Sequence, residues 1–201
     1  IRDMWPFTSG AHYTMDFENF EKSLLAKLIK RFKKKCYKEN IRFVAPSKWI
    51  KNIAEQSDIL KNKKIIQIDN NVDLKHFTHI PKDKARNVLN IKTKKKIILY
   101  GAHNPQSKRK GWDLMLDALK KINKQEYFLI IFGSFWSHKI LDKIGIEYKS
   151  MGFIKEINFL NLVYSCADLF VASSIQDAWP KTFAEAMYCG TPVVCFKNTS
   201  I

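Results

Sequence analysis

The sequence predicts an α/β protein built on a parallel β-sheet with helices on both faces. Short apolar runs alternate with helical patterns of about ten residues over most of the chain. The apolar runs are nearly continuous, as expected for parallel strands that helices cover on both faces. With 201 residues and 46% apolar content, the chain is long enough to bury a sizeable core without cross-links.

The first part of the chain is the less regular one. Residues 1–17 are rich in aromatic side chains and contain Pro6 and Gly10, so we expect a loop there. The segment 68–73 (IDNNVD) is typical of a turn and is the best domain boundary. We therefore predict one domain at 1–69 and a second at 70–201. The elements expected before the boundary are a helix from Glu18 to Tyr37, a strand at 41–45, a helix at 48–57 capped by Ser47, and a strand at 65–68.

The first predicted helix combines an apolar face with a basic remainder. Its apolar face is expected to pack on a core, with lysine stems covering the flanks. The alternative is binding at a membrane interface, because the polar face is so basic. The residues of the apolar face are Leu24, Leu25, Leu28, Ile29 and Phe32.

After the boundary the alternation of helices and strands is sharper. Two loops, at 101–111 (GAHNPQSKRKG) and 173–182 (SSIQDAWPKT), both follow strands and are therefore expected to open onto the same crevice. The elements expected here are a short helix at 82–91, a strand at 96–101, a helix at 112–122, a strand at 127–133, a helix near 137–144, a strand at 146–151, a helix at 156–167, a strand at 168–172, a helix at 182–189 and a strand at 192–196.

Charge and cysteine content bear on the binding partners and the cellular location of the protein. The formal net charge is +16, with basic clusters at 27–38, 61–64 and 92–96. Such clusters are solvated faces, or they meet an anionic membrane, a phosphorylated substrate or nucleic acid. No zinc-type spacing links the cysteines, which favours reduced thiols in the cytoplasm. The sequence has no run of about 18 apolar residues, so no transmembrane helix is predicted. No signal peptide is recognisable at the start.

The clearest chemistry lies around the helix predicted to start near Thr182. Its first amides have no partner within the helix, and with the helix dipole they suit a phosphate. Glu185 lies one turn in and Asp177 lies before the helix, so two carboxylates are available for hydroxyl groups. The pattern suits a nucleotide sugar. The simpler interpretation is that both acids only stabilise the start of the helix.

A second feature supports the phosphate interpretation. Lys108, Arg109 and Lys110 follow a strand and come just before a helix, where cations neutralise a pyrophosphate. Alone, such a trio is often a solvated loop. Since both loops are expected to open onto one crevice, we predict a site for a nucleotide sugar there.

At these residues the chain resembles the retaining glycosyltransferases of family four, which are GT-B enzymes with two Rossmann-like domains. The motif EAMYCGTPVV at 185–194 is the most specific match. The resemblance implies a Rossmann-like parallel sheet of a GT-B C-terminal domain, cut short at its C-terminus, plus a fragment of the N-terminal acceptor domain. Segments at 2–16, 43–60 and 68–77 resemble the N-terminal domains of colanic-acid-type and capsular polysaccharide transferases.

The resemblance also implies roles for individual residues. Asp177 would contact the donor sugar, Glu185 would bind the ribose hydroxyls, and Lys110 would neutralise the leaving diphosphate; these three are the implied catalytic residues. The residues implied in nucleotide binding are Gly101, Lys108, Arg109, Lys110, Lys181, Thr182 and Glu185.

The chain departs from the family pattern at three positions. Ala102 stands where an arginine is common, so Lys108 or Arg109 must supply that charge. Arg2 stands where the family often has an acceptor-side histidine, and Ala11 replaces a usual cysteine. The first two departures bear on how catalysis proceeds.

The implied reaction is sugar transfer from a nucleotide-sugar donor to a hydroxyl acceptor in bacterial surface polysaccharide synthesis. The acceptor would be lipid-linked or a saccharide, and no nucleic acid is expected. The resemblance implies that neither a cofactor nor a metal ion is needed, and consistent with this no Asp-x-Asp motif and no His or Cys cluster with ligand spacing occurs. The expected location is cytoplasmic, including peripheral contact with an anionic membrane at the inner face of the plasma membrane. The isolated chain is expected to be inactive.

Two other classes of function stay open at this stage. An epimerase or phosphorylase of the same fold would use a similar crevice, although the pair of acids argues against it. A non-catalytic nucleotide-binding module, or a basic module that binds nucleic acid, is compatible with the charge. The aromatic residues mostly lie in apolar patterns rather than between lysines on an exposed sheet, which disfavours nucleic acid.

Overall fold

The computed structural model describes residues 1–16, 18–137 and 139–197. Phe17, at the end of the predicted first loop, and His138, in the predicted helix near 137–144, lie outside the described residues. The chain forms two compact units. The first unit comprises residues 1–71, 176–180 and Lys197, and the second comprises 72–175 and 181–196.

The second unit is built on a five-stranded parallel sheet, which confirms the predicted α/β class. The strands are β3 (Lys96–Gly101), β4 (Tyr127–Phe132), β5 (Tyr148–Ser150), β6 (Leu169–Ala172) and β7 (Val193–Cys195). Their order is β5-β4-β3-β6-β7. The chain moves outward from β3 to β5 and then returns to the other side of β3. The direction of winding therefore changes between β3 and β6, where ligands of such sheets bind.

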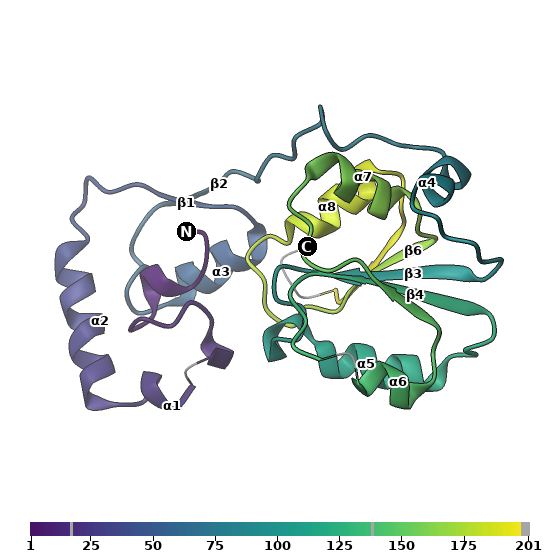
Figure 1. Cartoon of the computed structure of the whole chain (residues 1–201). Helices are drawn as coiled ribbons and strands as arrows, with labels where there is room; N and C mark the ends of the chain where they lie inside the picture. The colour runs from purple at the N-terminus through teal and green to yellow at the C-terminus, as the bar shows by residue number, and fades with distance from the viewer. Residues whose placement is uncertain (17, 138, 198–201) are drawn as a thin grey trace. The chain divides into compact units, whose positions relative to one another are not determined.

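Helices cover both faces of this sheet. In Figure 1, α4 (Lys82–Val88), α7 (Ile157–Ser165) and α8 (Lys181–Tyr188) lie on one face, while α5 (Trp112–Lys121) and α6 (Lys139–Ile144) lie on the other. The core beneath α5 and α6 includes Leu129 and Ile131, which are completely buried. The nearly continuous apolar strands are explained by this double covering.

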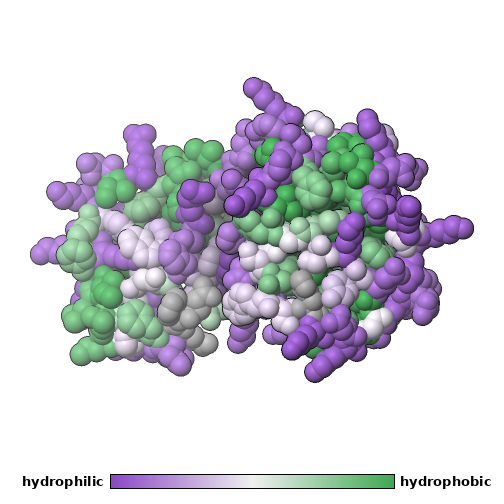
Figure 2. Space-filling view, in the orientation of Figure 1, coloured by the Kyte–Doolittle hydropathy of each residue, from purple (hydrophilic) through white to green (hydrophobic). Residues whose placement is uncertain are grey.

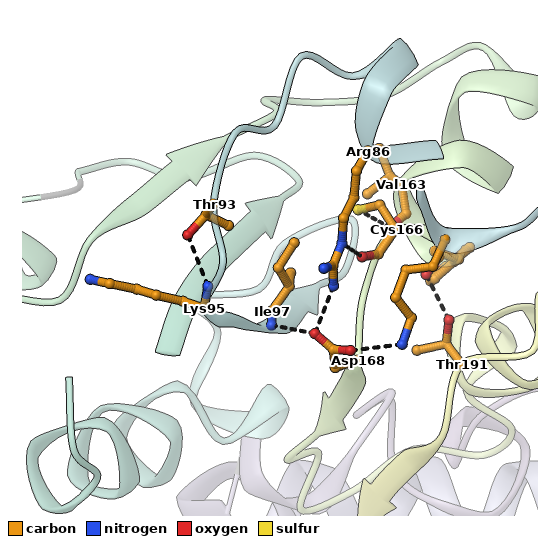
Figure 3. A network of polar contacts seen from close by, with 10 residues as sticks. Arg86, Thr93, Lys95, Ile97, Val163, Cys166, Asp168 and Thr191 are labelled. Carbon is orange, nitrogen blue, oxygen red and sulfur yellow. Dashed lines mark hydrogen bonds and ion pairs between the residues drawn. The ribbon is translucent and has the colours of Figure 1, made fainter. Parts of the chain in front are cut away.

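The amino ends of the central strands are held by a network of ion pairs (Figure 3). Asp168, just before β6, pairs with Lys82 and Arg86 at 2.7 Å each and accepts the Ile97 amide of β3 at 2.7 Å. The Arg86 Nε also donates to the Cys166 carbonyl at 2.9 Å. Burial alone would raise the pKa of Asp168, but the hydrogen bonds from Lys82, the Ile97 amide and Arg86 outweigh it and lower that pKa.

The first unit contains a two-stranded parallel sheet of β1 (Phe43–Ala45) and β2 (Ile65–Gln67), with α3 (Lys48–Gln56) between them in the chain. Ser47 caps α3, as predicted, by accepting the Ile50 amide. The predicted first loop has two 3₁₀ turns, η1 (Trp5–Phe7) and η2 (Thr14–Asp16). The loop also supplies core residues of this unit: Met4, Phe7 and Tyr13.

The segment 176–180 belongs to the first unit because its backbone is bonded there. The Ser47 hydroxyl donates to the Ala178 carbonyl at 2.6 Å, and the Ala178 amide donates to the Tyr13 hydroxyl at 3.2 Å. Ala178 itself is buried in the core of that unit. The chain therefore returns to the first unit just before α8 begins.

The helix predicted from Glu18 to Tyr37 is wrong in two respects. It is divided into α1 (Glu18–Glu21) and α2 (Leu24–Cys36). The backbone of Ser23 is extended rather than helical, and its side chain caps α2 by accepting the Ala26 amide at 3.1 Å. In addition, the apolar face does not pack on a core: Leu24 is 75% exposed and Phe32 is 69% exposed.

The four cysteines are free thiols, with Cys166 and Cys189 buried, as expected from their apolar surroundings. Within the described part of the chain, no helix is both long and apolar enough to cross a lipid bilayer.

Candidate functional site

A narrow pocket opens at the carboxyl ends of β3 and β6, where the winding of the sheet changes direction. The end of β3 contributes Tyr100, Gly101 and Ala102. Lys110 and Thr182 complete the lining from the two loops that the sequence singled out. The remaining lining comes from β6 and the residues after it, Phe170 to Ser174. The pocket is small, with a water-accessible volume of about 10 Å³, which is room for about one water molecule; it marks the place where the two predicted loops meet.

The two loops are tied to each other by hydrogen bonds around η3 (Lys108–Lys110). The Ser173 Oγ lies 2.9 Å from the Lys110 carbonyl and 3.0 Å from the Gly111 carbonyl, and it donates to both. The Ile175 amide donates to the Arg109 carbonyl at 2.8 Å. Inside the first loop, the Tyr100 hydroxyl donates to the Pro105 carbonyl at 2.9 Å. These bonds fix the basic turn beside the pocket.

Glycine is required where the loops touch. Gly111 has φ +68°, and a Cβ there would lie 1.9 Å from the Ser173 carbonyl oxygen. A Cβ on Gly101 would lie 2.4 Å from the Phe132 ring. Any side chain at these positions would push apart the strand ends that form the pocket, so the glycines allow the close approach.

The first loop also carries polar groups that the protein does not satisfy. Among the described residues, the Asn104 Oδ1 and the Ser107 Oγ are buried and have no hydrogen-bond partner. A buried group without a partner costs about 1–3 kcal/mol. Such atoms call for an explanation, and neither residue is among those that line the pocket.

Helix α8 brings its amino end to the same pocket. It begins at Lys181, directly after Pro180 and one residue earlier than predicted. Thr182 is therefore a residue of the first turn, and it lines the pocket. The first amides of the helix have no intrahelical partner and carry its positive dipole end, which attracts an anion.

Glu185 lies on the first turns of α8, three residues after Thr182. Its Oε2 accepts a hydrogen bond from the Tyr164 hydroxyl at 2.9 Å. Burial raises the pKa of Glu185, and the Tyr164 bond and the Lys181 charge offset this only in part. Among the described residues, no hydrogen bond reaches its other carboxylate oxygen, which leaves that oxygen for a ligand hydroxyl.

The structure brings most of the predicted site residues together in the second unit. Gly101, Lys110 and Thr182 line the one pocket, and Lys108 and Arg109 share the turn with Lys110. Lys181 is the exposed first residue of α8, and Glu185 follows on the same helix.

Asp177 lies elsewhere, in the segment that folds with the first unit. It is buried, and its carboxylate accepts the Trp179 amide at 3.3 Å. Its contact with a donor sugar stays a prediction that rests on the resemblance.

Sequence reasoning missed Tyr164 and Ser173, whose hydroxyls donate hydrogen bonds to the predicted site residues Glu185 and Lys110. Tyr164 is fully buried and was part of an apolar helical pattern, so nothing marked its hydroxyl as a partner of Glu185. Burial and the Glu185 charge raise the pKa of Tyr164 well above its usual value, which keeps it a proton donor. Ser173 lay in a loop already singled out, and its place directly after a strand was the available signal.

The described residues contain no group of three or more His, Cys, Asp or Glu side chains placed to hold a metal ion. The groups around the pocket are a lysine, backbone amides, hydroxyls and a partly buried carboxylate. The chemistry of this set suits an anion next to hydroxyl groups.

An α/β unit with an anion-type pocket at the switch point of its sheet is a nucleotide-binding fold. The model of the glycosyl transferases group 1 family matches residues 81–201. The chain therefore belongs to the group 1 glycosyltransferases. No curated protein sequence matches it.

Solved structures agree on the fold. Sucrose-phosphate synthase from Thermosynechococcus elongatus superposes with a TM-score of 0.72 at 21% identity, over 90% of this chain and 47% of that one. A glycosyltransferase from Rickettsia africae gives a TM-score of 0.65 at 17% identity, over 92% and 49%. Anabaena Alr3699/HepE, solved with UDP and glucose, gives 0.66 at 20%, over 87% and 49%. The chain thus has the fold of part of a GT-B protein and spans about half the length of these structures.

Proposed function

We propose that this chain is the donor-binding part of a glycosyltransferase that moves a sugar from a nucleotide-sugar donor to a hydroxyl acceptor in bacterial surface polysaccharide synthesis. The proposed reaction retains the anomeric configuration and needs no metal ion. One observation carries the proposal: Gly101, Lys110 and Thr182 line a single pocket at the switch point of the sheet, in a member of the group 1 family.

The diphosphate of the donor binds between Lys110 and the amino end of α8. The lysine supplies a full positive charge, and the free amides near Thr182 supply hydrogen bonds and the dipole. Gly101 lines the same pocket, and its lack of a side chain lets the end of β3 pack against the Phe132 ring. Both groups act more strongly as negative charge develops on the departing diphosphate, so they stabilise the transition state more than the ground state.

Glu185 binds the ribose hydroxyls of the nucleotide. The Tyr164 hydroxyl holds one carboxylate oxygen and so directs the side chain, while the second oxygen accepts from the ribose. Only the ionised carboxylate accepts hydrogen bonds at both oxygens, so the raised pKa of Glu185 makes donor binding sensitive to mild acid. Asp177 is assigned to the donor sugar, on the resemblance alone.

The acceptor is a saccharide or a lipid-linked saccharide at the cytoplasmic face of the membrane. Acceptor binding and turnover belong to the whole protein. The 201-residue chain on its own is expected to bind donor without measurable transfer.

Donor binding is tested by thermal shift and calorimetry with UDP, GDP and ADP, and then with the sugar conjugates of the nucleotide that binds. UDP is the first probe, because Alr3699/HepE was solved with UDP. We expect Lys110→Gln to lower the affinity about tenfold by removing one charge from the diphosphate site. Lys121→Gln on the far end of α5 is the matched control and should leave binding unchanged.

Two further measurements test the reaction itself on the whole protein. Product analysis by NMR should show retention of the anomeric configuration, and transfer should persist in excess EDTA. Failure of every nucleotide to bind, or equal binding by Lys110→Gln and the unmodified protein, would contradict the proposal.

A further inference from the structure

The connection between β6 and α8 leaves the second unit and then returns to it. Residues up to Ile175 and from Lys181 onward fold with the second unit, whereas 176–180 fold with the first. The chain between the end of β6 at Ala172 and the start of α8 is also longer than the roughly two to six residues that usually connect a strand and a helix. The longer connection therefore carries Asp177 into the first unit.

Asp177 is unusual among the acids of this chain. It is 7% exposed and is the only buried one among the acidic residues whose burial the structure describes. Hydrophilic side chains are spread over the visible face in Figure 2, and an acid that only served the start of α8 would fit among them. Because taking a carboxylate out of water costs free energy, its burial requires fixed contacts around it.

Two hydroxyls of the first unit bind the backbone directly after Asp177. The Tyr13 hydroxyl accepts the Ala178 amide at 3.2 Å, and this amide belongs to the peptide that joins Asp177 to Ala178. The Ser47 hydroxyl donates to the Ala178 carbonyl at 2.6 Å, which belongs to the next peptide. Ser47 and Tyr13 are both buried. Two successive peptide groups are thus fixed by side chains that lie 131 and 165 residues away in the sequence.

The residue before Asp177 is bonded to the same unit. The Gln176 side-chain nitrogen donates to the Thr14 hydroxyl at 2.8 Å, and the Gln176 side-chain oxygen accepts the Met15 amide at 3.3 Å. Asp177 itself accepts the Trp179 amide within the segment. Since the residues on both sides of Asp177 are fixed, its backbone has little freedom to move its carboxylate.

We propose that Ser47 and Tyr13 are positioning residues for Asp177, and that their bonds to Ala178 place its carboxylate for recognition of the donor sugar. This inference rests on the proposed function, in which Asp177 contacts the sugar. A carboxylate that is already in place binds hydroxyls without the entropy cost of ordering a loop. Recognition of the sugar thereby depends on the first unit, whereas the diphosphate site is built from residues of the second.

The first experiment compares a nucleotide with its sugar conjugate. Calorimetry on the whole protein gives the affinities for UDP and UDP-glucose, which are the first probes because Alr3699/HepE was solved with each of them. The conjugate that binds most tightly in the donor screen replaces UDP-glucose if it differs. Asp177→Asn should lower the affinity for the conjugate about tenfold and that for UDP less than about twofold, because only the sugar contact is weakened.

The positioning residues should show the same selective loss. Ser47→Ala is expected to lower the affinity for the sugar conjugate about fivefold, and Tyr13→Phe about threefold, with the UDP affinity unchanged within about twofold. Tyr13→Phe is the milder change, since it removes one hydroxyl and leaves the ring in the core. Ser47→Ala also removes the cap of α3, so its unfolding temperature is measured alongside.

The first unit offers a matched control for each variant. The Ser57 hydroxyl donates to the Ala54 carbonyl at 2.6 Å and accepts the Leu60 amide at 3.1 Å, so Ser57→Ala loses the same kinds of bond as Ser47→Ala. The Tyr37 hydroxyl donates to the Pro6 carbonyl at 2.9 Å, so Tyr37→Phe matches Tyr13→Phe. Both controls should keep both affinities.

A double-mutant cycle tests whether Ser47 acts through Asp177. In the Asp177→Asn background, Ser47→Ala should cause no further loss of affinity for the sugar conjugate, because the carboxylate that it positions is already absent. A purely structural role of Ser47 would give the same loss in both backgrounds and would contradict the inference.

The remaining outcomes separate this inference from the proposed function. If Asp177→Asn shows the selective loss but Ser47→Ala and Tyr13→Phe bind like the unmodified protein, or lose both ligands equally, the positioning role is overturned and the donor site stands. If Asp177→Asn keeps its full preference for the conjugate, the assignment of Asp177 to the sugar is overturned together with the positioning role. Failure of every nucleotide to bind would overturn the proposed function itself and this inference with it.

Discussion

The two ends of the five-stranded sheet are built on opposite principles. At the amino ends, Asp168 is bonded by Lys82, Arg86 and the Ile97 amide, so its charge is matched within the chain (Figure 3). At the carboxyl ends, Lys110 and the amino end of α8 face a pocket, and Asn104 and Ser107 keep buried atoms without a partner among the described residues. The amino end uses its charges to hold strands together, whereas the carboxyl end combines loop-fixing hydrogen bonds, such as those of Ser173, with a lysine and helix amides at the pocket.

This difference separates stability from binding in a testable way. A substitution at the amino end should lower the free energy of unfolding and leave nucleotide affinity unchanged. A substitution at the carboxyl end should do the reverse. A variant that lowers both the free energy of unfolding and the nucleotide affinity would contradict this separation.

The largest expected effect is at the amino end. Asp168→Ala removes the partner of two cations and of the Ile97 amide, and leaves Arg86 partly buried without a counter-charge. We expect a loss of about 3 kcal/mol in the free energy of unfolding, measured by chemical denaturation. Asp58→Ala removes a surface ion pair and serves as the control, with an expected change within about 0.5 kcal/mol. Equal losses in the two variants would mean that the Asp168 network contributes nothing specific.

The next effect is at the carboxyl end. Glu185→Ala should lower nucleotide affinity about 100-fold, because a partly buried acceptor of ligand hydroxyls is lost. The free energy of unfolding should change by no more than about 1 kcal/mol, because removing a costly buried carboxylate offsets the loss of the acceptor for the buried Tyr164 hydroxyl. Calorimetry and denaturation measure the two quantities. Glu55→Ala, on an exposed part of α3, is the control; unchanged affinity in Glu185→Ala would remove Glu185 from the site.

The two carboxylates also predict opposite responses to pH. The pKa of Asp168 is lowered, so its contribution to stability is complete above the unfolded value of about 3.9 and is lost as pH falls through the folded pKa. The pKa of Glu185 is raised, so its contribution to stability is complete below the unfolded value of about 4.3 and is lost as pH rises through the folded pKa.

In mild acid above about pH 4, the chain should therefore lose donor affinity while it stays folded. The fall should approach tenfold per pH unit below the pKa of Glu185, because binding needs the ionised form. A nucleotide sugar is the ligand to use, since its diphosphate diester does not titrate in this range. The Glu185→Gln variant should bind weakly with a flat profile; an unchanged slope in this variant would assign the titration to another group.

The smallest effect is that of Tyr164→Phe. It removes only the hydroxyl that directs Glu185, so we expect about a threefold loss of affinity, a small change in stability, and a further rise in the pKa of Glu185. The shift of the pH profile toward neutral separates a positioning role from a purely structural one. An identical profile would show that the 2.9 Å bond to Glu185 does not act on binding.

The sheet and the pocket were predictable because they follow from local patterns. Apolar runs between helices define β3, β4, β6 and β7. Loops after parallel strands meet at one edge, which is how Lys110 and Thr182 could be paired from the sequence. The orientation of α2 was not predictable. Its periodicity identifies an apolar face, but only the contacts of Lys33 with the Trp5 and Thr8 carbonyls decide that this face points outward. Tyr164 was missed because a buried aromatic in a helix is normally core, and the affiliation of Ala178 with the first unit depends on the distant Tyr13 and Ser47.

The central claim, that the carboxyl end of the sheet and not the amino end binds the nucleotide, is tested most directly by hydrogen–deuterium exchange with and without saturating UDP or, if UDP does not bind, the nucleotide that does. We predict slower exchange in the peptides that cover residues 101–111 and 181–189, and unchanged exchange in those that cover 82–97. Protection of the 82–97 region, or no change at 101–111 and 181–189 under conditions where calorimetry shows binding, would contradict the account.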